Sequence, residues 1–240
     1  MTQFNKKLSA LVVCIAVLAP VSANAASEAT LIVKGDFTPA ACVPTLDNGG
    51  VVDFGSMNSA LLATATGSTG MVQLQSKSIN LTVTCDAAAS VGIFAQDNRT
   101  SSTVTLSSST YVENGVAPTK HLTTSVAAFG LGSTDDGKSI GAYSIRAAPA
   151  GVKVDGEAAD LLYKDTSVGT WLTVAADGRV FYPDQSRVIT VADTGKVVPT
   201  YFTEMTLPLT IATAVQTKDK LGTSSEVKLD GNATISLIYL

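Results

Sequence analysis

The sequence predicts an all-β sandwich, and three observations indicate it. The chain has 30 Thr and 23 Ser but only 16 Lys plus Arg, a balance that favours strands over charged surface helices. Apolar and polar residues alternate along several short runs, which is typical of strands with one buried face. Turns rich in Asp, Asn and Gly separate these runs. Without a linker or an internal repeat, the pattern predicts one sandwich domain with an elaborated middle region.

The N-terminal 25 residues have the pattern of an export signal. Lys6 and Lys7 precede an apolar run over residues 8–19, and Ala23-Asn24-Ala25 forms a small-x-small cleavage site. A membrane anchor would need about 18 apolar residues. Lipidation of Cys14 is not expected after Val13. We therefore expect an exported chain that begins at residue 26. The net charge of −4 separately excludes a strongly basic nucleic-acid binder.

Cleavage would leave two cysteines, Cys42 and Cys85, in a compartment that oxidises thiols. We expect them to form one disulfide. The bridge would close a loop of about 43 residues and destabilise the unfolded chain by roughly 4 kcal/mol. A reactive or metal-binding pair is the alternative, but the spacing is far from CxxC and no His lies nearby.

Alternating runs mark the expected strands in chain order. The clearest lie at residues 29–33, 79–85, 205–215 and 233–239. Pro208 interrupts the third run and indicates a sheet edge or a bulge. Residues 157–164 are the one stretch that suggests a short helix.

Several of these residues resemble chaperone–usher pilin subunits. The similarity lies in VKGDFTPAAC at 33–42, VDFG at 52–55, INLTVTCD at 79–86, and the ending at 231–240 with its penultimate Tyr239. Among these proteins, the larger β-fimbrial subunits are the most similar, because of Asp97-Asn98-Arg99 and FGLG at 129–132. The resemblance implies an immunoglobulin-like sandwich that lacks its last strand, and hence an apolar groove and an unpaired edge.

The resemblance also implies that residues 26–35 form a donor segment. In donor-strand complementation, an extended segment fills the groove of another chain with every second side chain. Here Ala29, Leu31 and Val33 would insert, and Gly35 would mark the passage into the subunit's own domain at 36–240. The alternative from the residues alone is an ordinary first strand over 27–34 in the same sandwich.

The C-terminal run places Ala233, Ile235, Leu237 and Tyr239 on one side of a strand. On its own, this run predicts a last core strand. The pilin resemblance adds that its exposed edge pairs with a periplasmic chaperone and that the carboxylate of Leu240 meets basic chaperone residues.

Catalytic and metal sites have little support in the sequence. There is one His, His121, and no GxSxG motif. Asp135-Asp136-Gly137-Lys138 lacks the later ligands of a calcium loop and is expected to be a turn. Trp171 could stack on a sugar, but a lone Trp in a sandwich is more often core.

We therefore expect a non-enzymatic structural subunit of a chaperone–usher fimbria, without a cofactor, exported through the periplasm to the cell surface. The expected partners are neighbouring subunits, a periplasmic chaperone and an outer-membrane usher, and no nucleic acid. A tip or minor adhesin that binds a host or surface glycan is the alternative, and an exported enzyme is disfavoured.

Overall fold

The computed structural model describes residues 29–36, 38, 40–113, 121–222 and 226–240. The chain divides after Thr38 into two units, which are described separately. The predicted signal peptide, residues 1–25, lies outside the described residues, as do residues 26–28 of the predicted donor segment.

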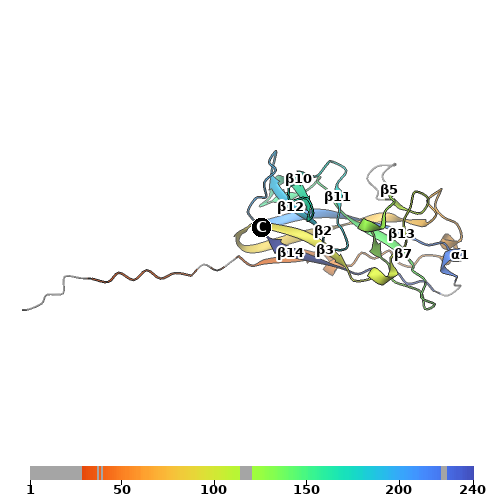
Figure 1. The fold of residues 1–240 in the computed structure, drawn as a ribbon. Coiled ribbons are helices and arrows are strands. Elements are labelled where there is room, and N and C mark those ends of the chain that lie inside the picture. The colour runs from red at the N-terminus through yellow and green to blue at the C-terminus, as the bar shows by residue number, and fades with distance from the viewer. Residues whose placement is uncertain (1–28, 37, 39, 114–120, 223–225) are drawn as a thin grey trace, which may run out of the picture. The chain divides into compact units, whose positions relative to one another are not determined.

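Residues 29–36 of the first unit have no regular secondary structure (Figure 1). Leu31 is 87% exposed and Val33 is 86% exposed. No strand of the described residues pairs with this segment, and the first strand of the fold begins only at Cys42. The strand that the alternation predicts over 29–33 is therefore not formed here. This segment has no neighbouring strand to complete its backbone hydrogen bonds.

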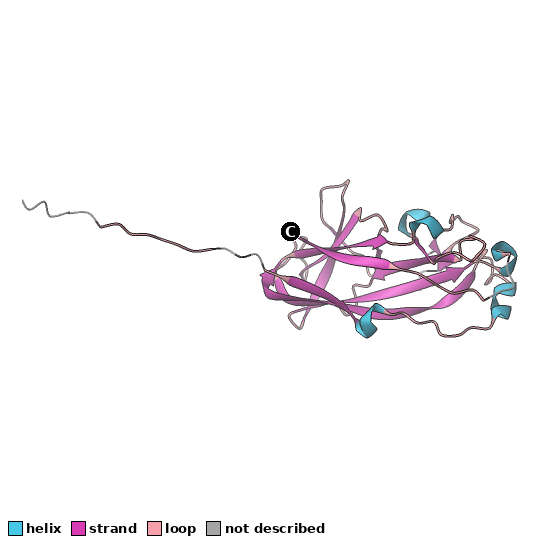
Figure 2. Cartoon of the chain, turned by 90° about the horizontal axis from the view of Figure 1, so that it is seen from below, coloured by secondary structure: helices cyan, strands magenta, loops and turns pink. Residues whose placement is uncertain are grey.

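Strands are the main regular secondary structure of the second unit, and long loops connect them (Figure 2). Its longer strands are β1 (Cys42–Leu46), β2 (Val72–Ala89), β3 (Val91–Asp97), β7 (Gly141–Ala147), β9 (Glu157–Asp165), β12 (Arg187–Asp193), β13 (Phe202–Val215) and β14 (Ala233–Tyr239). The two-residue strands are β4 (Val112–Glu113), β5 (His121–Leu122), β6 (Phe129–Gly130), β8 (Lys153–Val154), β10 (Leu172–Thr173) and β11 (Arg179–Val180). The helical turns are η1 (Asp47–Gly50), η2 (Ser59–Ala63), η3 (Thr100–Ser102), η4 (Ser125–Ala127) and α1 (Lys218–Leu221). None of the helices in the described ranges is long and apolar enough to cross a membrane.

The strands pair in one continuous antiparallel path, β1-β2-β13-β8-β9-β12-β3-β14. The short strand β8 carries the path from the layer of β1, β2 and β13 to the layer of β9, β12 and β3. β7 lies beside β13 in the first layer, with Leu209 opposite Ala147 and Val215 opposite Gly141. The predicted all-β sandwich is confirmed, and the path ends in β1 at one side and β14 at the other.

Two apolar clusters fill the second unit. The larger lies between the layers, where Leu81, Ile93, Ile189 and Leu207 are almost fully buried. The smaller lies on the outer face of β7 and β13, where the segment around β4, β5 and η4 covers Ala142, Ala212 and Ala214. β13 is therefore packed on both faces.

Residues 157–164 form a strand, so the expected helix is wrong. β9 pairs with β12 from Arg187 opposite Asp165 to Asp193 opposite Ala159. Leu161 and Leu162 face opposite sides of the strand, and both are buried. Pairing and burial on both faces outweigh the modest helix propensity of Glu, Ala, Leu and Lys in this stretch.

Pro208 lies inside a central strand rather than at an edge. β13 pairs with β2 on one side and with β8 and β7 on the other. The register shifts of β13 fall at Phe202/Glu204 and Ile211/Thr213, not at the proline. Pro208 sits where the neighbour changes from β8 to β7, so its missing N–H falls at a gap in the ladder.

Candidate functional site

An open seam lies between β1 and β14, the two ends of the sheet path. Within the described residues, β1 pairs only with β2, and β14 only with β3. The backbone N–H of Cys42 donates to Tyr239 Oη at 2.9 Å, which closes one end of the seam. Further along, Leu46 and Ile235 line a shared pocket. The strands therefore run in opposite directions across the seam, and the edges that face each other there are unpaired.

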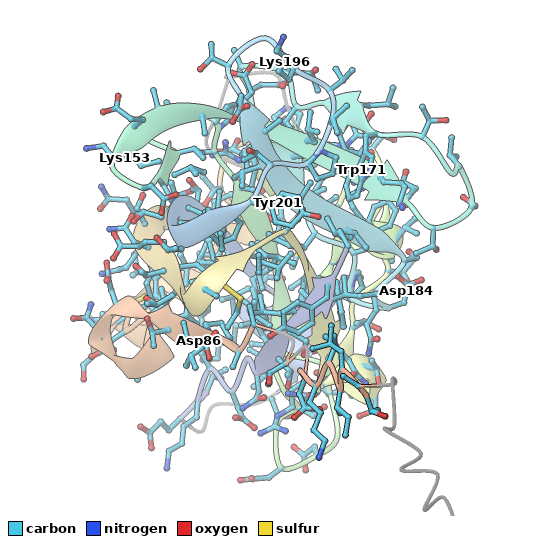
Figure 3. The ribbon with its side chains drawn as sticks, turned by 90° about the vertical axis from the view of Figure 1, so that its left-hand side faces the viewer. Asp86, Lys153, Trp171, Asp184, Lys196 and Tyr201 are labelled. Carbon is cyan, nitrogen blue, oxygen red and sulfur yellow. A yellow bond between two sulfur atoms is a disulfide. The ribbon has the colours of Figure 1, made fainter. Side chains whose placement is uncertain are left out.

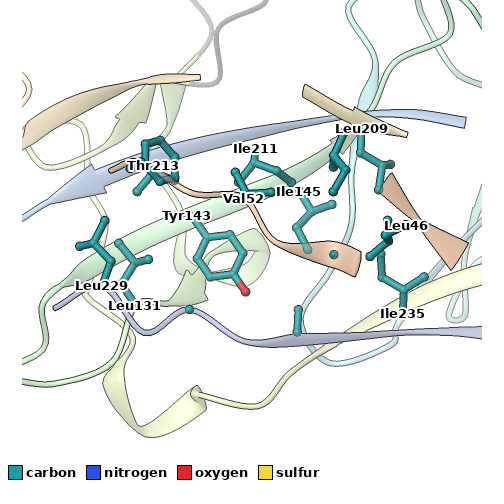
Figure 4. A pocket seen from close by; sticks show the side chains of 15 residues that line it. Leu46, Val52, Leu131, Tyr143, Ile145, Leu209, Ile211, Thr213, Leu229 and Ile235 are labelled. Carbon is teal, nitrogen blue, oxygen red and sulfur yellow. The ribbon is translucent and has the colours of Figure 1, made fainter. Parts of the chain in front are cut away.

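Three adjoining pockets run along the seam from this closed end, with volumes of about 350, 190 and 410 Å³. Leu46 and Ile235 are common to the first two, and Val52, Phe54 and Leu229 are common to the last two. Together they form one groove, which we call the seam groove, and Figure 4 shows its middle pocket. Its middle part is floored by Ile79, Leu209, Ile211, Thr213, Tyr143 and Ile145.

The floor of the seam groove is apolar except for two hydroxyl groups. Thr213 on β13 lies directly opposite Tyr143 on β7. Thr213 Oγ1 is buried and has no hydrogen-bond partner among the described atoms. Burial, and secondarily the nearby Asp97, raise the pKa of Tyr143 well above its ordinary value, so this phenol stays neutral. The groove can therefore accept an uncharged, mainly aliphatic chain.

The first rim of the groove is the extended segment 51–58, which follows β1. Asp47 anchors its start, because its carboxylate accepts from the backbone N–H of Asn80 at 3.2 Å and from Asn80 Nδ2 at 3.0 Å. Asn48 and Gly49 then have positive φ and turn the chain. Val52 and Phe54 point to the groove as lining residues, and no described strand pairs with this segment.

The second rim is the extended segment 226–232, which precedes β14. Arg99 holds this segment with a bidentate ion pair, in which Nε donates to Asp230 Oδ2 at 2.9 Å and Nη2 donates to Asp230 Oδ1 at 3.0 Å. Hydrogen bonding to Arg99 lowers the pKa of Asp230. The backbone N–H of Asp230 also donates to the carbonyl of Leu131 at 2.9 Å. These contacts fix the second rim against the end of β3.

Two glycines make this arrangement possible. The backbone N–H of Gly130 donates to Asp97 Oδ2 at 2.9 Å, and a Cβ at Gly130 would overlap the carbonyl oxygen of Arg99. A Cβ at Gly231 would lie 2.9 Å from Cε1 of the Tyr143 ring. The motifs 97–99 and 129–132, which are far apart in the sequence, therefore meet at the second rim.

The disulfide between Cys42 and Cys85 is confirmed, and it fastens β1 at the closed end of the seam. The two residues are opposite each other in the β1–β2 ladder, with a Cα–Cα distance of 4.0 Å. Beyond it, Ala41 donates its N–H to Asp86 Oδ1 at 2.8 Å, and Asp86 donates its N–H to the Ala41 carbonyl at 3.0 Å. The chain therefore leaves the sandwich at a fixed point.

The predicted C-terminal strand is β14, and its residues divide between the groove and the closed end. Ala233 and Ile235 line the groove. Leu237 packs against the main core. Tyr239 and Leu240 are exposed, and the backbone N–H of Leu240 donates to the Ser90 carbonyl at 3.0 Å.

Sequence comparisons show that this chain is similar to known proteins. Protein GltF of Escherichia coli strain K12 is 32% identical over 257 residues, an alignment that covers 99% of each chain. Uncharacterized protein YhcF of the same strain is 32% identical over 236 residues, covering 91% of this chain and 93% of YhcF. The model of a family described as "Protein of unknown function (DUF1120)" matches residues 31–144.

The chain belongs to the family of GltF and YhcF.

In this GltF-family chain, the matched residues 31–144 include the disulfide, the first rim and Tyr143. They end before β13 and β14, so the match covers only part of the seam groove.

Sequence reasoning predicted the strands that carry Ile79, Leu209 and Ile211, but it missed the part of the groove floor that β7 supplies in this GltF-family chain. β7 contributes Tyr143 and Ile145, yet all of its residues are buried, so it shows no alternation to detect. Leu229 and Gly231 continue the alternation of Ala233 and Ile235 toward the N-terminus, and this extension was a usable signal. Val52 and Phe54 also alternate.

Trp171 is half-buried outside the groove, and Lys164 Nζ lies 4.6 Å from its ring centroid. Residues 134–138 form a hydrogen-bonded turn, in which Gly137 donates its N–H to the Thr134 carbonyl at 2.8 Å. Over the part of the chain that the structure describes, no three His, Cys, Asp or Glu side chains are grouped to hold a metal ion.

Proposed function

We propose that this protein is a structural subunit of a chaperone–usher fimbria that polymerises by donor-strand exchange. The observation that carries the proposal is the seam groove, an apolar channel between two unpaired strand edges. Unpaired edges invite another strand, because their N–H and C=O groups have no partner. An inserted strand would satisfy both edges and bury alternate side chains in the groove.

The occupant that fits is the N-terminal segment of another copy. Residues 29–36 are unpaired and exposed, and Ala29, Leu31 and Val33 share one parity. Their side chains are uncharged and small or branched, which suits an aliphatic floor. The pilin resemblance of the cysteine spacing and of the C-terminal strand supports the same arrangement.

The proposal includes the route by which the subunit reaches the surface. A periplasmic chaperone would cover the groove and the edge of β14 until an outer-membrane usher exchanges it for the next subunit. The fibre would be extracellular, and the role is structural rather than enzymatic. Glycan binding at Trp171 gains no added support, because Lys164 occupies one face of the ring.

The test compares two substitutions in the same segment. Leu31→Asp would place a charge in the apolar groove, at a cost of several kcal/mol. We expect it to abolish fibres in cells that carry the cognate chaperone and usher, as seen by electron microscopy. Ile32→Asp is the matched control, since Ile32 has the opposite parity and would face away from the groove.

A binding measurement completes the test. The mature Leu31→Asp protein keeps an intact groove, so a synthetic peptide of residues 26–35 should raise its stability, by about 2.7 kcal/mol at a hundred times the dissociation constant. The same peptide with Asp at position 31 should have no effect. Absence of fibres from the unmodified protein, together with no stabilisation by the peptide, would overturn the proposal.

A further inference from the structure

The loop between β12 and β13 carries an exposed apolar patch outside the seam groove. Val198 and Tyr201 are each 68% exposed, and Val197 is also exposed. The loop backbone is nonetheless fastened: Gly195 donates its N–H to Asp160 Oδ2 at 2.7 Å, and Thr200 donates to the Val191 carbonyl at 3.0 Å. Isolated exposed apolar residues are ordinary, but three within five residues on a fixed loop mark an interaction surface.

This patch lies at the end of the sandwich where the chain leaves it. Phe202, next to Tyr201, pairs with Ala89, and Asp86, near the same end of β2, holds Ala41. Figure 3 shows Tyr201 and Asp86 on this one end. Figure 1 shows the C-terminus at the same end and α1 at the opposite end of the second unit.

The length of the connecting chain then limits where a neighbouring copy can be. The proposed function puts residues 26–35 in the groove of that neighbour, and six Cα–Cα steps separate Gly35 from Ala41. A fully extended chain of this length spans about 20 Å. One end of the neighbour's groove must therefore lie within that reach of Ala41, at the end of the sandwich that also carries the patch. This places the patch on the side that faces the neighbouring copy.

The identity of that groove end follows from the requirement for growth. If Gly35 lay at the neighbour's closed end, the two points of chain exit would face each other, and the contact would join like ends. A repeating fibre needs a head-to-tail contact between different surfaces. The far end of the groove is such a surface, and η2 presents an apolar face there, with Leu61 55% exposed and Met57, just before it, 41% exposed.

We propose that the loop patch Val197, Val198 and Tyr201 seats on Met57 and Leu61 of the next copy, beside the far end of its seam groove. This inference rests on the proposed function and names a second contact between the same partners. The contact would bury apolar side chains on both copies. It would also fix how successive subunits are oriented, which an extended connecting segment alone would not do.

Cysteine cross-linking in assembled fibres tests the contact. A chain carrying Val198→Cys and Leu61→Cys should form a covalent ladder on mild oxidation, visible in denaturing gels after boiling. Val198→Cys with Val126→Cys is the matched control and should give no ladder. Val126 is as exposed as Leu61, but it lies on η4. Fibres that form normally without the 198–61 cross-link would overturn this contact while leaving donor-strand exchange in place. Cross-linking of the single variant Val198→Cys to itself would indicate like ends and overturn it as well.

A second measurement distinguishes an effect on this contact from an effect on the seam groove. Replacing Val198 and Tyr201 with Ser should reduce fibre yield several-fold, while stabilisation of the Leu31→Asp background by the 26–35 peptide stays unchanged. Unchanged fibre yield would contradict the contact. Loss of peptide stabilisation would show that these residues act on the groove or the fold instead.

Discussion

At the residue scale, cation–π contacts connect β9, the segment around β11 and β12. The Arg187 guanidinium lies 3.6 Å from the Tyr182 ring centroid, and Arg179 lies 3.9 Å from that of Tyr163. Arg187 Nε donates to Asp165 Oδ1 at 2.6 Å, and its side chain is only 3% exposed. Asp165 is therefore the partner that allows this arginine to be buried with its charge.

We predict that Asp165→Ala lowers the free energy of unfolding by about 3 kcal/mol, because it leaves a buried guanidinium without its counter-ion. For a domain of this size, the melting temperature should fall by roughly 10 °C. Asp136→Ala, in an exposed turn, is the control and should change little. Thermal unfolding followed by circular dichroism measures both, and equal stabilities would contradict the prediction.

The same pair sets the direction of a pH dependence. Hydrogen bonding to Arg187 lowers the pKa of Asp165 in the folded protein. A depressed folded pKa contributes stability above the unfolded value, near 3.9, and this contribution disappears as the pH falls through the folded pKa. The difference in stability between the unmodified protein and Asp165→Ala should therefore narrow below about pH 4.

At the element scale, β1 is both a strand and a wall of the groove. It has five residues and one neighbour, so the disulfide supplies much of its attachment. Loss of the bridge would act twice, by relaxing the unfolded chain and by loosening the side of the groove that leads into the first rim.

We predict that replacing Cys42 and Cys85 with Ser destabilises the protein by about 4 kcal/mol in the chain-entropy model. The variant should also bind the 26–35 peptide more weakly than the unmodified protein does. Titration at a temperature where both proteins are folded measures this difference in affinity apart from the loss of global stability. Val43→Ser, at an exposed position of the same strand, should leave the affinity intact. Unaltered affinity in the disulfide-free protein would mean that β1 is positioned without the bridge.

At the scale of the whole molecule, the open seam has unpaired strand edges and apolar surface, which favour non-specific pairing of the isolated protein. We predict that the protein expressed alone in the periplasm aggregates and that its cognate chaperone rescues it. Leu237→Asp with Tyr239→Asp should abolish the rescue. Because Leu237 packs against the core, Tyr239→Asp alone is the milder variant and Ile238→Asp the matched control on the opposite face. Pull-down yield measures the outcome, and wild-type yield from Tyr239→Asp and the double variant would refute this role of β14.

The sequence predicted the fold class, the disulfide and the C-terminal strand, because each has a local signal: alternation along β14, and an even number of cysteines after removal of the signal. It could not predict β7 or β9. β7 is buried along its whole length, and β9 buries the adjacent residues Leu161 and Leu162, so neither strand alternates cleanly. β9 also contains residues of good helix propensity. The sequence also could not show that Tyr143 and Thr213 are neighbours in the groove floor, because only strand pairing brings them together.

The position of the seam also determines stoichiometry. The strand path from β1 to β14 has two free terminal edges, which could in principle acquire two additional strands and so become a branch point. Here both edges border a single gap, and one inserted strand would saturate them together. Under the proposed function, association through this gap would have a valence of one. A protein that also donates one strand of its own would then be a link in an unbranched chain.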